Sequence, residues 1–204
     1  MSFQGYGSDG AHAPGRCSDR SKCMYGDTAT ESYIVAHNIL NAHAAAVELY
    51  RMKYQHEQKG CIGIVLNQDW AEPWTTSAQD IDAAMRRREF QLGWFGDPLF
   101  FGHYPTSMVD LVGDRLPKFT EKQRLRLMHS IDFLGINHYS TRYYSSNEEV
   151  IPAVQQKGWS FDQRTVEHIL DPLGKLIGPQ GESYVLIKNM TITSYTVADS
   201  ASLG

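Results

Sequence analysis

Apolar residues recur at helical spacing over residues 33–54, which is the clearest periodic pattern in the chain. Steps of three and four residues relate the positions of one broad stripe: Val35, Ile39, Leu40, Ala42, Ala46, Val47, Leu49 and Tyr50. A stripe of this kind is typical of an amphipathic helix that buries one face. We therefore expect a long helix here, ending before Gly60. His43 flanks the stripe and is expected to be buried with a hydrogen-bond partner, not to bind a metal.

Two near-continuous apolar runs predict buried strands. Residues 61–67 read Cys-Ile-Gly-Ile-Val-Leu-Asn, and residues 131–137 read Ile-Asp-Phe-Leu-Gly-Ile-Asn. Runs like these suit strands that are covered on both faces, as in a parallel sheet. Cys61 opens the first run, so we expect it to be a small core residue.

Helical patterns occupy three stretches between the two runs: residues 78–94, 105–112 and 120–129. Ser77 is a candidate N-cap, and Thr120 with Gln123 resembles a capping box. The aromatic stretch 95–104 contains Gly and Pro and is expected to be a loop. The resulting order of helix, strand, helix and strand favours an α/β architecture with a parallel sheet.

The remaining segments show little periodicity. Residues 5–32 are rich in Gly, Ser, Asp and Pro and predict a long loop, which is either functional or disordered. Residues 145–180 are expected to be irregular. Apolar and polar residues alternate over 183–197, which fits an edge strand or a poorly ordered tail.

Composition and charge exclude several function classes. The chain has 204 residues, 42% of them hydrophobic, and a formal net charge of -4, which suits one globular domain. The basic run 86–88 lies within a helical pattern and is expected to be a solvated helix face, so the sequence indicates no nucleic-acid partner. No apolar run approaches the roughly 18 residues of a membrane span, and the N-terminus has no signal-peptide pattern.

The cysteines leave two readings open. Cys17 and Cys23 stand six positions apart in a polar loop, where a short-range disulfide and two free thiols are both compatible with the spacing. A zinc site is not expected, because no second Cys or His pair has ligand spacing. We expect neither a metal nor a cofactor.

Candidate chemistry lies after the two predicted strands. In parallel α/β folds, functional residues gather at the carboxyl ends of the strands. Here these ends carry residues 67–73, Asn-Gln-Asp-Trp-Ala-Glu-Pro, and residues 137–139, Asn-His-Tyr. Amides and carboxylates that hydrogen-bond hydroxyls, next to aromatic rings that stack on C–H surfaces, are a mixture suited to sugars. Asp69 and Glu72 are the only close carboxylate pair there, and we expect them to cap the loop rather than to bracket a glycosidic bond.

Several segments together resemble glycoside hydrolase family 1, with the plant-type β-glucosidases as the best match. The matching segments follow the order of the family: residues 5–6 and 12–18, residues 33–38 and 42–44, residues 62–67 with Trp70 and 72–73, residues 93–95, 97–98 and 102–105, residues 133–139, and residues 174–179. The resemblance implies part of a (β/α)8 barrel, comprising about strands five and six with their helices, without barrel closure. It covers residues 1–180, and residues 181–204 are expected to be a divergent, poorly ordered tail.

The resemblance also implies roles for individual residues. Asn137 and Tyr139 match the Asn-x-Tyr pair at the end of the sixth strand, whose tyrosine contacts the catalytic nucleophile. The remaining matches fall in the strand-end region near the aglycone site: Asn67, Asp69 and Trp70. Cys17 and Cys23 match loop cysteines that form a disulfide in plant-type members.

The family hydrolyses β-glucosides with retention, using glutamates in Thr-Phe-Asn-Glu-Pro and Thr-Glu-Asn-Gly motifs. Neither motif occurs in this sequence. We therefore expect a family member that is inactive alone. The alternatives are a non-catalytic fragment that binds a β-glucoside or oligosaccharide or another molecule, and a chain complemented by another that supplies the missing strands. Family members are often secreted, vacuolar or plastidial, so the compartment stays open.

Overall fold

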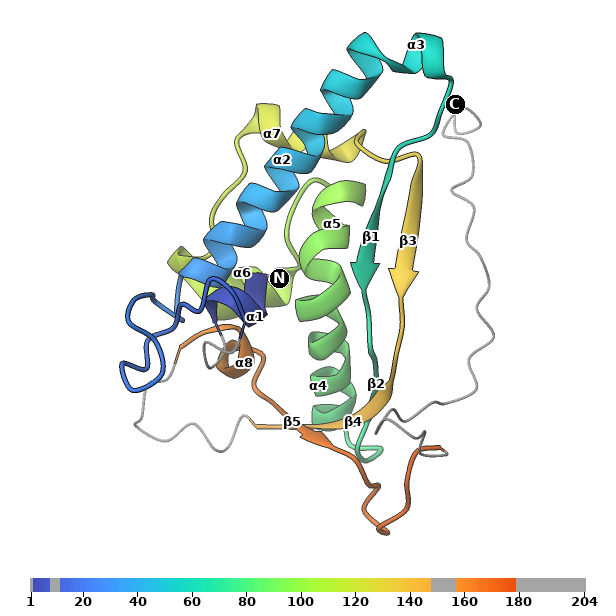
Figure 1. Ribbon diagram of the computed structural model, residues 1–204. Helices are drawn as coiled ribbons and strands as arrows, with labels where there is room; N and C mark the ends of the chain where they lie inside the picture. Colours follow the sequence, from blue (N-terminus) through green and yellow to red (C-terminus); the bar gives the residue numbers. More distant parts are fainter. Residues whose placement is uncertain (1, 8–11, 148–156, 179–204) are drawn as a thin grey trace.

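The computed structural model describes residues 2–7, 12–147 and 157–178 (Figure 1). Two parallel strands form its central ribbon, β1 (Gly63–Asn67) and β3 (Phe133–Asn137). Their register pairs Gly63 with Phe133 and Asn67 with Asn137. The helices lie on one side of this ribbon, and no closed barrel is formed by the described residues. The predicted α/β architecture with a partial barrel is thus confirmed.

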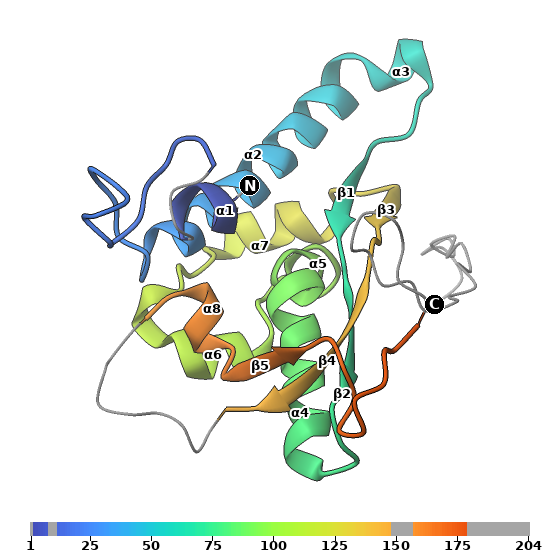
Figure 2. The same cartoon turned by 60° about the horizontal axis from the view of Figure 1, so that its bottom comes forward.

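A second, smaller sheet continues from the carboxyl ends of the ribbon. It has the order β2 (Trp70–Pro73), β4 (Thr141–Ser146) and β5 (Thr165–His168). The β2–β4 pair is parallel and the β4–β5 pair antiparallel. Figure 2 shows this sheet beside helix α4 (Ala78–Arg88), against which Ala71 and Tyr144 are buried. Residues 145–180 were expected to be irregular. That expectation was wrong for the last two residues of β4, for a short helix over Trp159–Asp162 and for β5.

The predicted long helix is α2 (Glu31–Lys53), preceded by α1 (Ser2–Tyr6) and followed by the short α3 (Gln55–Gln58). Of the predicted stripe, Leu40 and Val47 are buried as expected, but Ile39 is 37% and Leu49 45% exposed. The core side of α2 carries Tyr33, Ala36, His37, Leu40, Ala44 and Val47. That side includes a phenol and an imidazole, whose polar atoms find partners inside the protein. The buried face is therefore rotated from the predicted stripe and only partly overlaps it.

Helix α4 runs on through a π-helical turn, Glu89–Gly93, into α5 (Trp94–Phe100). The prediction of a loop over 95–104 was therefore wrong for its first half. Burial explains the difference, because Trp94 is only 2% and Leu99 1% exposed. Packing of these side chains outweighs the poor helix propensity of Gly and Pro in the same segment.

Two predicted caps are confirmed at helix starts. The Ser77 hydroxyl accepts a hydrogen bond from the Asp80 backbone N–H at the start of α4. Thr120 and Gln123 form the predicted capping box at α7 (Glu121–Met128). Between α5 and α7 lie α6 (Thr106–Val112) and a 3-10 turn, Gly113–Arg115. The last helix described is α8 (Trp159–Asp162).

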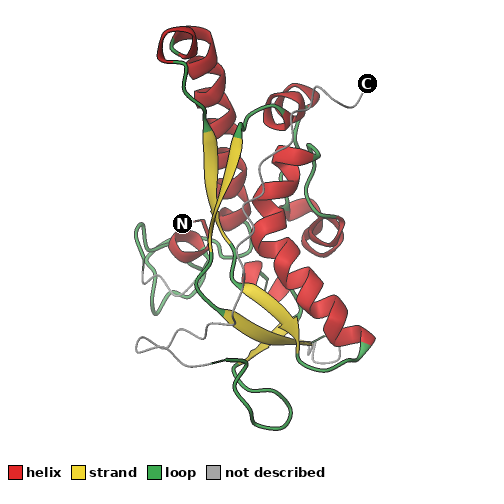
Figure 3. Ribbon diagram, turned by 90° about the vertical axis from the view of Figure 1, so that its right-hand side faces the viewer, coloured by secondary structure: helices red, strands yellow, loops and turns green. Residues whose placement is uncertain are grey.

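The main hydrophobic core lies between the helices and one face of the ribbon. It consists of Tyr33, Ala36, Leu40, Ala44, Leu66, Phe90, Trp94, Leu99, Tyr104, Met108, Val112, Leu116 and Leu127. Figure 3 shows the ribbon standing beside these helices. The prediction that Cys61 belongs to the core was wrong, because β1 begins two residues later and Cys61 is exposed. Residues 183–197 and the predicted tail 181–204 lie outside the described residues.

Candidate functional site

The last pair of the β1–β3 ribbon places two asparagines side by side. Asn67 and Asn137 are Cα partners at the carboxyl ends of the two strands. Both side chains are exposed. On parallel strands, side chains of directly paired residues project from the same face of the sheet. The sequence could not place these two amides together, since 70 positions separate them, but it did locate each at a strand end.

Backbone hydrogen bonds join the two junctions that follow. The Gln68 N–H donates to the Asn137 carbonyl at 2.9 Å, and the Trp70 N–H donates to the Ser140 carbonyl at 2.9 Å. His138 Nδ1 lies 2.8 Å from the Gln68 carbonyl oxygen. The predicted site residues therefore sit on a framework that is fixed from both strands.

Asp69, in the junction after β1, and Glu72, in β2, both accept hydrogen bonds. Asp69 Oδ1 accepts hydrogen bonds from the backbone N–H groups of Tyr139 at 3.3 Å and Ser140 at 3.0 Å. Glu72 Oε1 accepts one from the Trp70 indole at 3.2 Å. These contacts agree with the expectation that the two carboxylates cap the loop.

Trp70 and Tyr139 differ in how open they are. The Arg88 guanidinium lies over the Trp70 ring at 4.8 Å from its centroid, so it covers one face of the indole. Tyr139 is 57% exposed. The side chain of Tyr139 is thus more accessible at the strand ends than the ring of Trp70.

The basic run at the end of α4 is not the solvated face that was expected. Arg86 is only 9% exposed, and its Nε donates to the Gln163 carbonyl at 2.7 Å. Arg87 Nε donates to the Tyr144 hydroxyl at 3.0 Å. These partners come from residues far along the chain, so the helical pattern alone could not identify them.

A row of polar and aromatic side chains crosses the smaller sheet. Cα partners across its three strands are Glu72, Tyr143 and His168. Ser145 Oγ lies 2.7 Å from His168 Nε2, and the Trp74 ring stacks on the imidazole with centroids 4.3 Å apart. The sequence pattern did not indicate Tyr143, Trp74 or His168 as site residues. The only available signal was the position of residues 74 and 143 shortly after the strand ends.

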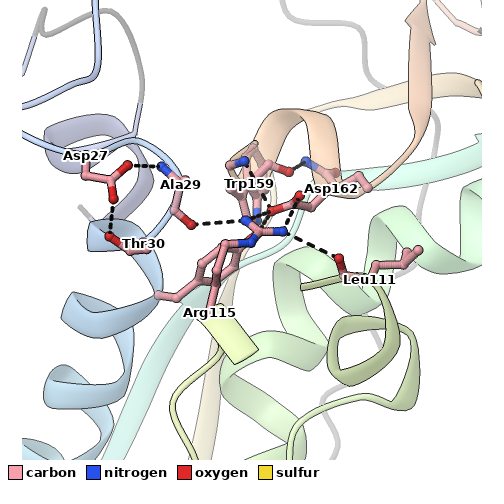
Figure 4. Close-up of polar contacts among 10 residues, drawn as sticks. Asp27, Ala29, Thr30, Leu111, Arg115, Trp159 and Asp162 are labelled. Atoms are coloured by element: carbon pink, nitrogen blue, oxygen red, sulfur yellow. Dashed lines mark hydrogen bonds and ion pairs between the residues drawn. The ribbon is translucent and has the colours of Figure 1, made fainter. Parts of the chain in front are cut away.

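A buried ion pair anchors the segment that leads into β5. Arg115 Nη1 and Nη2 each donate to the Asp162 carboxylate at 2.7 Å, and the Tyr33 hydroxyl donates to it at 2.6 Å (Figure 4). The hydrogen bond to Asp162 raises the pKa of Arg115. Burial, followed by the neighbouring Asp162 charge, raises the pKa of Tyr33. Arg115 therefore stays charged and Tyr33 stays neutral over the physiological range.

The N-terminal loop is tied to itself and to α2. Cys17 and Cys23 form a disulfide bond, and both are almost fully buried. Arg20 Nη2 donates to the Gly26 carbonyl at 2.7 Å. Arg16 forms an ion pair with Glu31 in the first turn of α2. The loop predicted over 5–32 is thus ordered where the structure describes it. Its two ends are helical, in α1 and at the start of α2.

The described residues contain no group of three or more His, Cys, Asp or Glu side chains placed to hold a metal ion. None of their helices combines the length and the apolar character that a membrane crossing requires. His43 has the partner that was expected, since its Nε2 lies 2.8 Å from the Ser130 carbonyl oxygen.

The chain is similar to known β-glucosidases in sequence and in structure. The family model for glycosyl hydrolase family 1 matches residues 1–192. Beta-glucosidase 34 of Oryza sativa subsp. japonica is 42% identical over 98% of this chain and 40% of its own length. Furcatin hydrolase of Viburnum furcatum is 47% identical over 87% of this chain and 32% of its own length.

Solved structures agree with these relatives. The rice Os3BGlu6 β-glucosidase has a TM-score of 0.85 at 43% identity, over 91% of this chain and 39% of that one. A β-glucosidase from the fungus Humicola insolens, in complex with glucose, has a TM-score of 0.82 at 42% identity, over 91% of this chain and 38% of that one. The chain spans about 40% of the length of the first of the curated relatives it matches. It belongs to glycosyl hydrolase family 1.

Proposed function

We propose that this chain forms one wall of the β-glucoside site of a retaining β-glucosidase. The observation that supports this most directly is the Asn67–Asn137 pair at the carboxyl ends of two parallel strands. Tyr139 lies two positions after Asn137, and Trp70 lies three positions after Asn67. In barrel enzymes, the carboxyl ends of the strands carry the active site. Membership of a glycoside hydrolase family supports a β-glucoside as the substrate class that this face would bind.

The chemistry of the wall is binding, not bond cleavage. Amide side chains donate to and accept from sugar hydroxyls, and the exposed ring of Tyr139 can stack on a sugar face. A retaining glycosidase needs two carboxyl groups about 5–5.5 Å apart that flank the scissile bond. Asp69 and Glu72 both accept hydrogen bonds from within the chain. We therefore propose that the catalytic glutamates lie outside these 204 residues, and that the chain alone does not turn over substrate.

An aryl β-glucoside tests both halves of the proposal. Purified chain should release no p-nitrophenol from p-nitrophenyl β-glucoside above a mock preparation from the same host. Calorimetry with millimolar phenyl β-glucoside should show saturable binding that Asn137→Ala removes. Asn38→Ala, an exposed asparagine on α2, is the matched control and should leave binding unchanged. Turnover above the mock would overturn the non-catalytic assignment, and flat calorimetry would overturn the binding assignment.

A second candidate function is complementation by a chain that carries further barrel strands. Exposed apolar side chains on the ribbon favour it, since Val65 is 58%, Phe133 47% and Ile136 49% exposed. Among the described residues, β1 and β3 pair only with each other, and open strand edges are sites for strand addition. Mixing this chain with the remaining strands of a family relative should give a stable complex.

The complex is measured by size-exclusion chromatography. Val65→Asp should prevent assembly, because it places a charge on the open ribbon. Leu173→Asp is the control, at a side chain that is 92% exposed in a turn. A chain that stays monomeric at every concentration of the partner would rule this candidate out.

A further inference from the structure

The strand register changes by one residue between the ribbon and the smaller sheet. Asn67 pairs with Asn137, a separation of 70 positions, whereas Trp70 pairs with Thr141, a separation of 71. The junction after β3 therefore contains one residue more than the junction after β1. An extra residue on one strand is a β-bulge, which re-aims side chains and is frequent next to active sites. Bulges between parallel strands are rare, so this one needs a local cause.

Asp69 supplies that cause. Its Oδ1 accepts hydrogen bonds from two consecutive backbone amides of the bulged junction, Tyr139 N–H at 3.3 Å and Ser140 N–H at 3.0 Å. Backbone bonds bracket the bulge on both sides, from Gln68 N–H to the Asn137 carbonyl and from Trp70 N–H to the Ser140 carbonyl. The carboxylate thus stands where the sheet ladder is interrupted.

We propose that Asp69 is a positioning residue for Tyr139. Its carboxylate holds the two amides of the bulge and thereby fixes the direction in which Tyr139 leaves the strand end. This inference rests on the proposed function, because Tyr139 matters only if a β-glucoside binds at the strand ends. It also makes the capping role expected for Asp69 specific, since Oδ1 is engaged with these two backbone amides.

The amide resonances of Tyr139 and Ser140 report the contact directly. In the 15N-labelled chain, Asp69→Asn should move both amide proton resonances upfield together, because a neutral amide oxygen is a weaker acceptor than a carboxylate. Glu72→Gln, at the nearby carboxylate in β2, should leave both resonances in place. Asp171→Asn is the matched control, because Asp171 caps two backbone amides in a distant turn, those of Leu173 and Lys175, and should move only those. Tyr139 and Ser140 amide resonances that stay in place in Asp69→Asn would overturn the proposal.

Binding of phenyl β-glucoside separates positioning from direct contact. Asp69→Ala leaves both amides without their acceptor and should weaken the Kd about tenfold, the effect of losing a hydrogen bond to a charged group. Asp69→Asn keeps an oxygen acceptor and should restore binding to within about twofold of the unaltered chain. Equal losses in both variants would show that the charge itself meets the ligand, and would overturn the proposal.

The two readouts also separate this inference from the proposed function. If the unaltered chain binds no phenyl β-glucoside, the binding function fails, and the amide resonances of Asp69→Asn still decide whether Asp69 holds the bulge. If the chain binds the glucoside but the amide resonances do not respond to Asp69→Asn, the function stands and the positioning role fails. Should Asp69→Ala not fold, the amide resonances and the binding of Asp69→Asn still decide the question.

Discussion

Arg115 and Asp162 form a two-point ion pair between segments 47 positions apart, with both N···O distances 2.7 Å. The side chain of Asp162 is 7% exposed and that of Arg115 is 18% exposed. Arg115 also donates to the Ala29 carbonyl at 3.0 Å, so one guanidinium joins α8 to the start of α2 (Figure 4). The segment that carries β5 and His168 is therefore held by a contact far from the strand ends.

Asp162→Ala should destabilise the protein by about 3 kcal/mol. The substitution leaves the Arg115 charge buried without its partner, and breaking buried pairs in this way costs roughly 3–5 kcal/mol. Urea denaturation measures the change. Glu121→Ala removes an exposed partner of Arg124 and should leave the midpoint almost unchanged, because exposed pairs contribute little. Equal shifts for the two variants would contradict a structural role for the buried pair.

Removing the disulfide should lower the free energy of unfolding by about 2 kcal/mol. Cys17 and Cys23 are six positions apart, and closing so short a loop restricts the unfolded chain by an entropy of this size. The double variant Cys17→Ser/Cys23→Ser should match the unaltered chain in the presence of dithiothreitol. Dithiothreitol should have no further effect on the double variant. A thermal midpoint insensitive to the reductant in the unaltered chain would disprove the contribution.

Asp80 should make stability fall at acidic pH. Burial acts to raise its pKa, but hydrogen bonds from Thr75 and from the Ser146 backbone N–H outweigh it, so the pKa is lowered. The folded state therefore favours the carboxylate, and its contribution is present above the unfolded pKa of about 3.9 and lost as the pH falls below it. The difference in stability between the unaltered chain and Asp80→Asn should narrow between pH 6 and pH 3. A constant difference over this range would be the contrary result.

Protonation of His37 should lower the stability of the protein over a higher pH range than protonation of Asp80 does. Burial lowers its pKa, since its Nδ1 contacts the Tyr104 hydroxyl at 3.0 Å and its ring stacks on Phe119. The folded state favours the neutral imidazole, whereas the unfolded chain takes up the proton near pH 6.5. Stability should therefore decline from pH 7 to pH 5, and His37→Gln should decline less. Burial also lowers the pKa of His43, so the slope is reduced and not abolished. Equal slopes of stability against pH in the unaltered chain and in His37→Gln would contradict the assignment to His37.

The sequence predicted those parts of the fold that depend on local pattern. The apolar runs that became β1 and β3, the span of α2 and the caps at Ser77 and Thr120 follow from residues within a few positions of one another. The buried face of α2 and the helical course of α5 did not, because distant partners decide them. Tyr33 can be buried because its hydroxyl donates a hydrogen bond to Asp162, which lies 129 positions further along the chain.

In the candidate site, too, local pattern predicted some features, and contacts between distant residues decided the others. Asn67 and Asn137 were selected because each ends an apolar run, and the structure makes them Cα partners. The bulge between Asp69 and Tyr139 was not predicted, because the register is a property of two paired strands and cannot be read from the sequence of either strand alone. The contact of Arg88 with Trp70 was missed for a related reason, because a charged residue in a helical pattern is assumed to face water.

Pairing of β1 with β3 also sets the order of events when the chain is made. Every pair in the ribbon joins residues 70 positions apart, so β1 can pair with β3 only after the segment through α4 to α7 has been synthesised. At about 5–20 residues per second, that delay is roughly 4–14 seconds on the ribosome. Contacts of such long range also slow folding in general. A nascent β1 is therefore a foreseeable substrate for chaperones that shield apolar segments during translation.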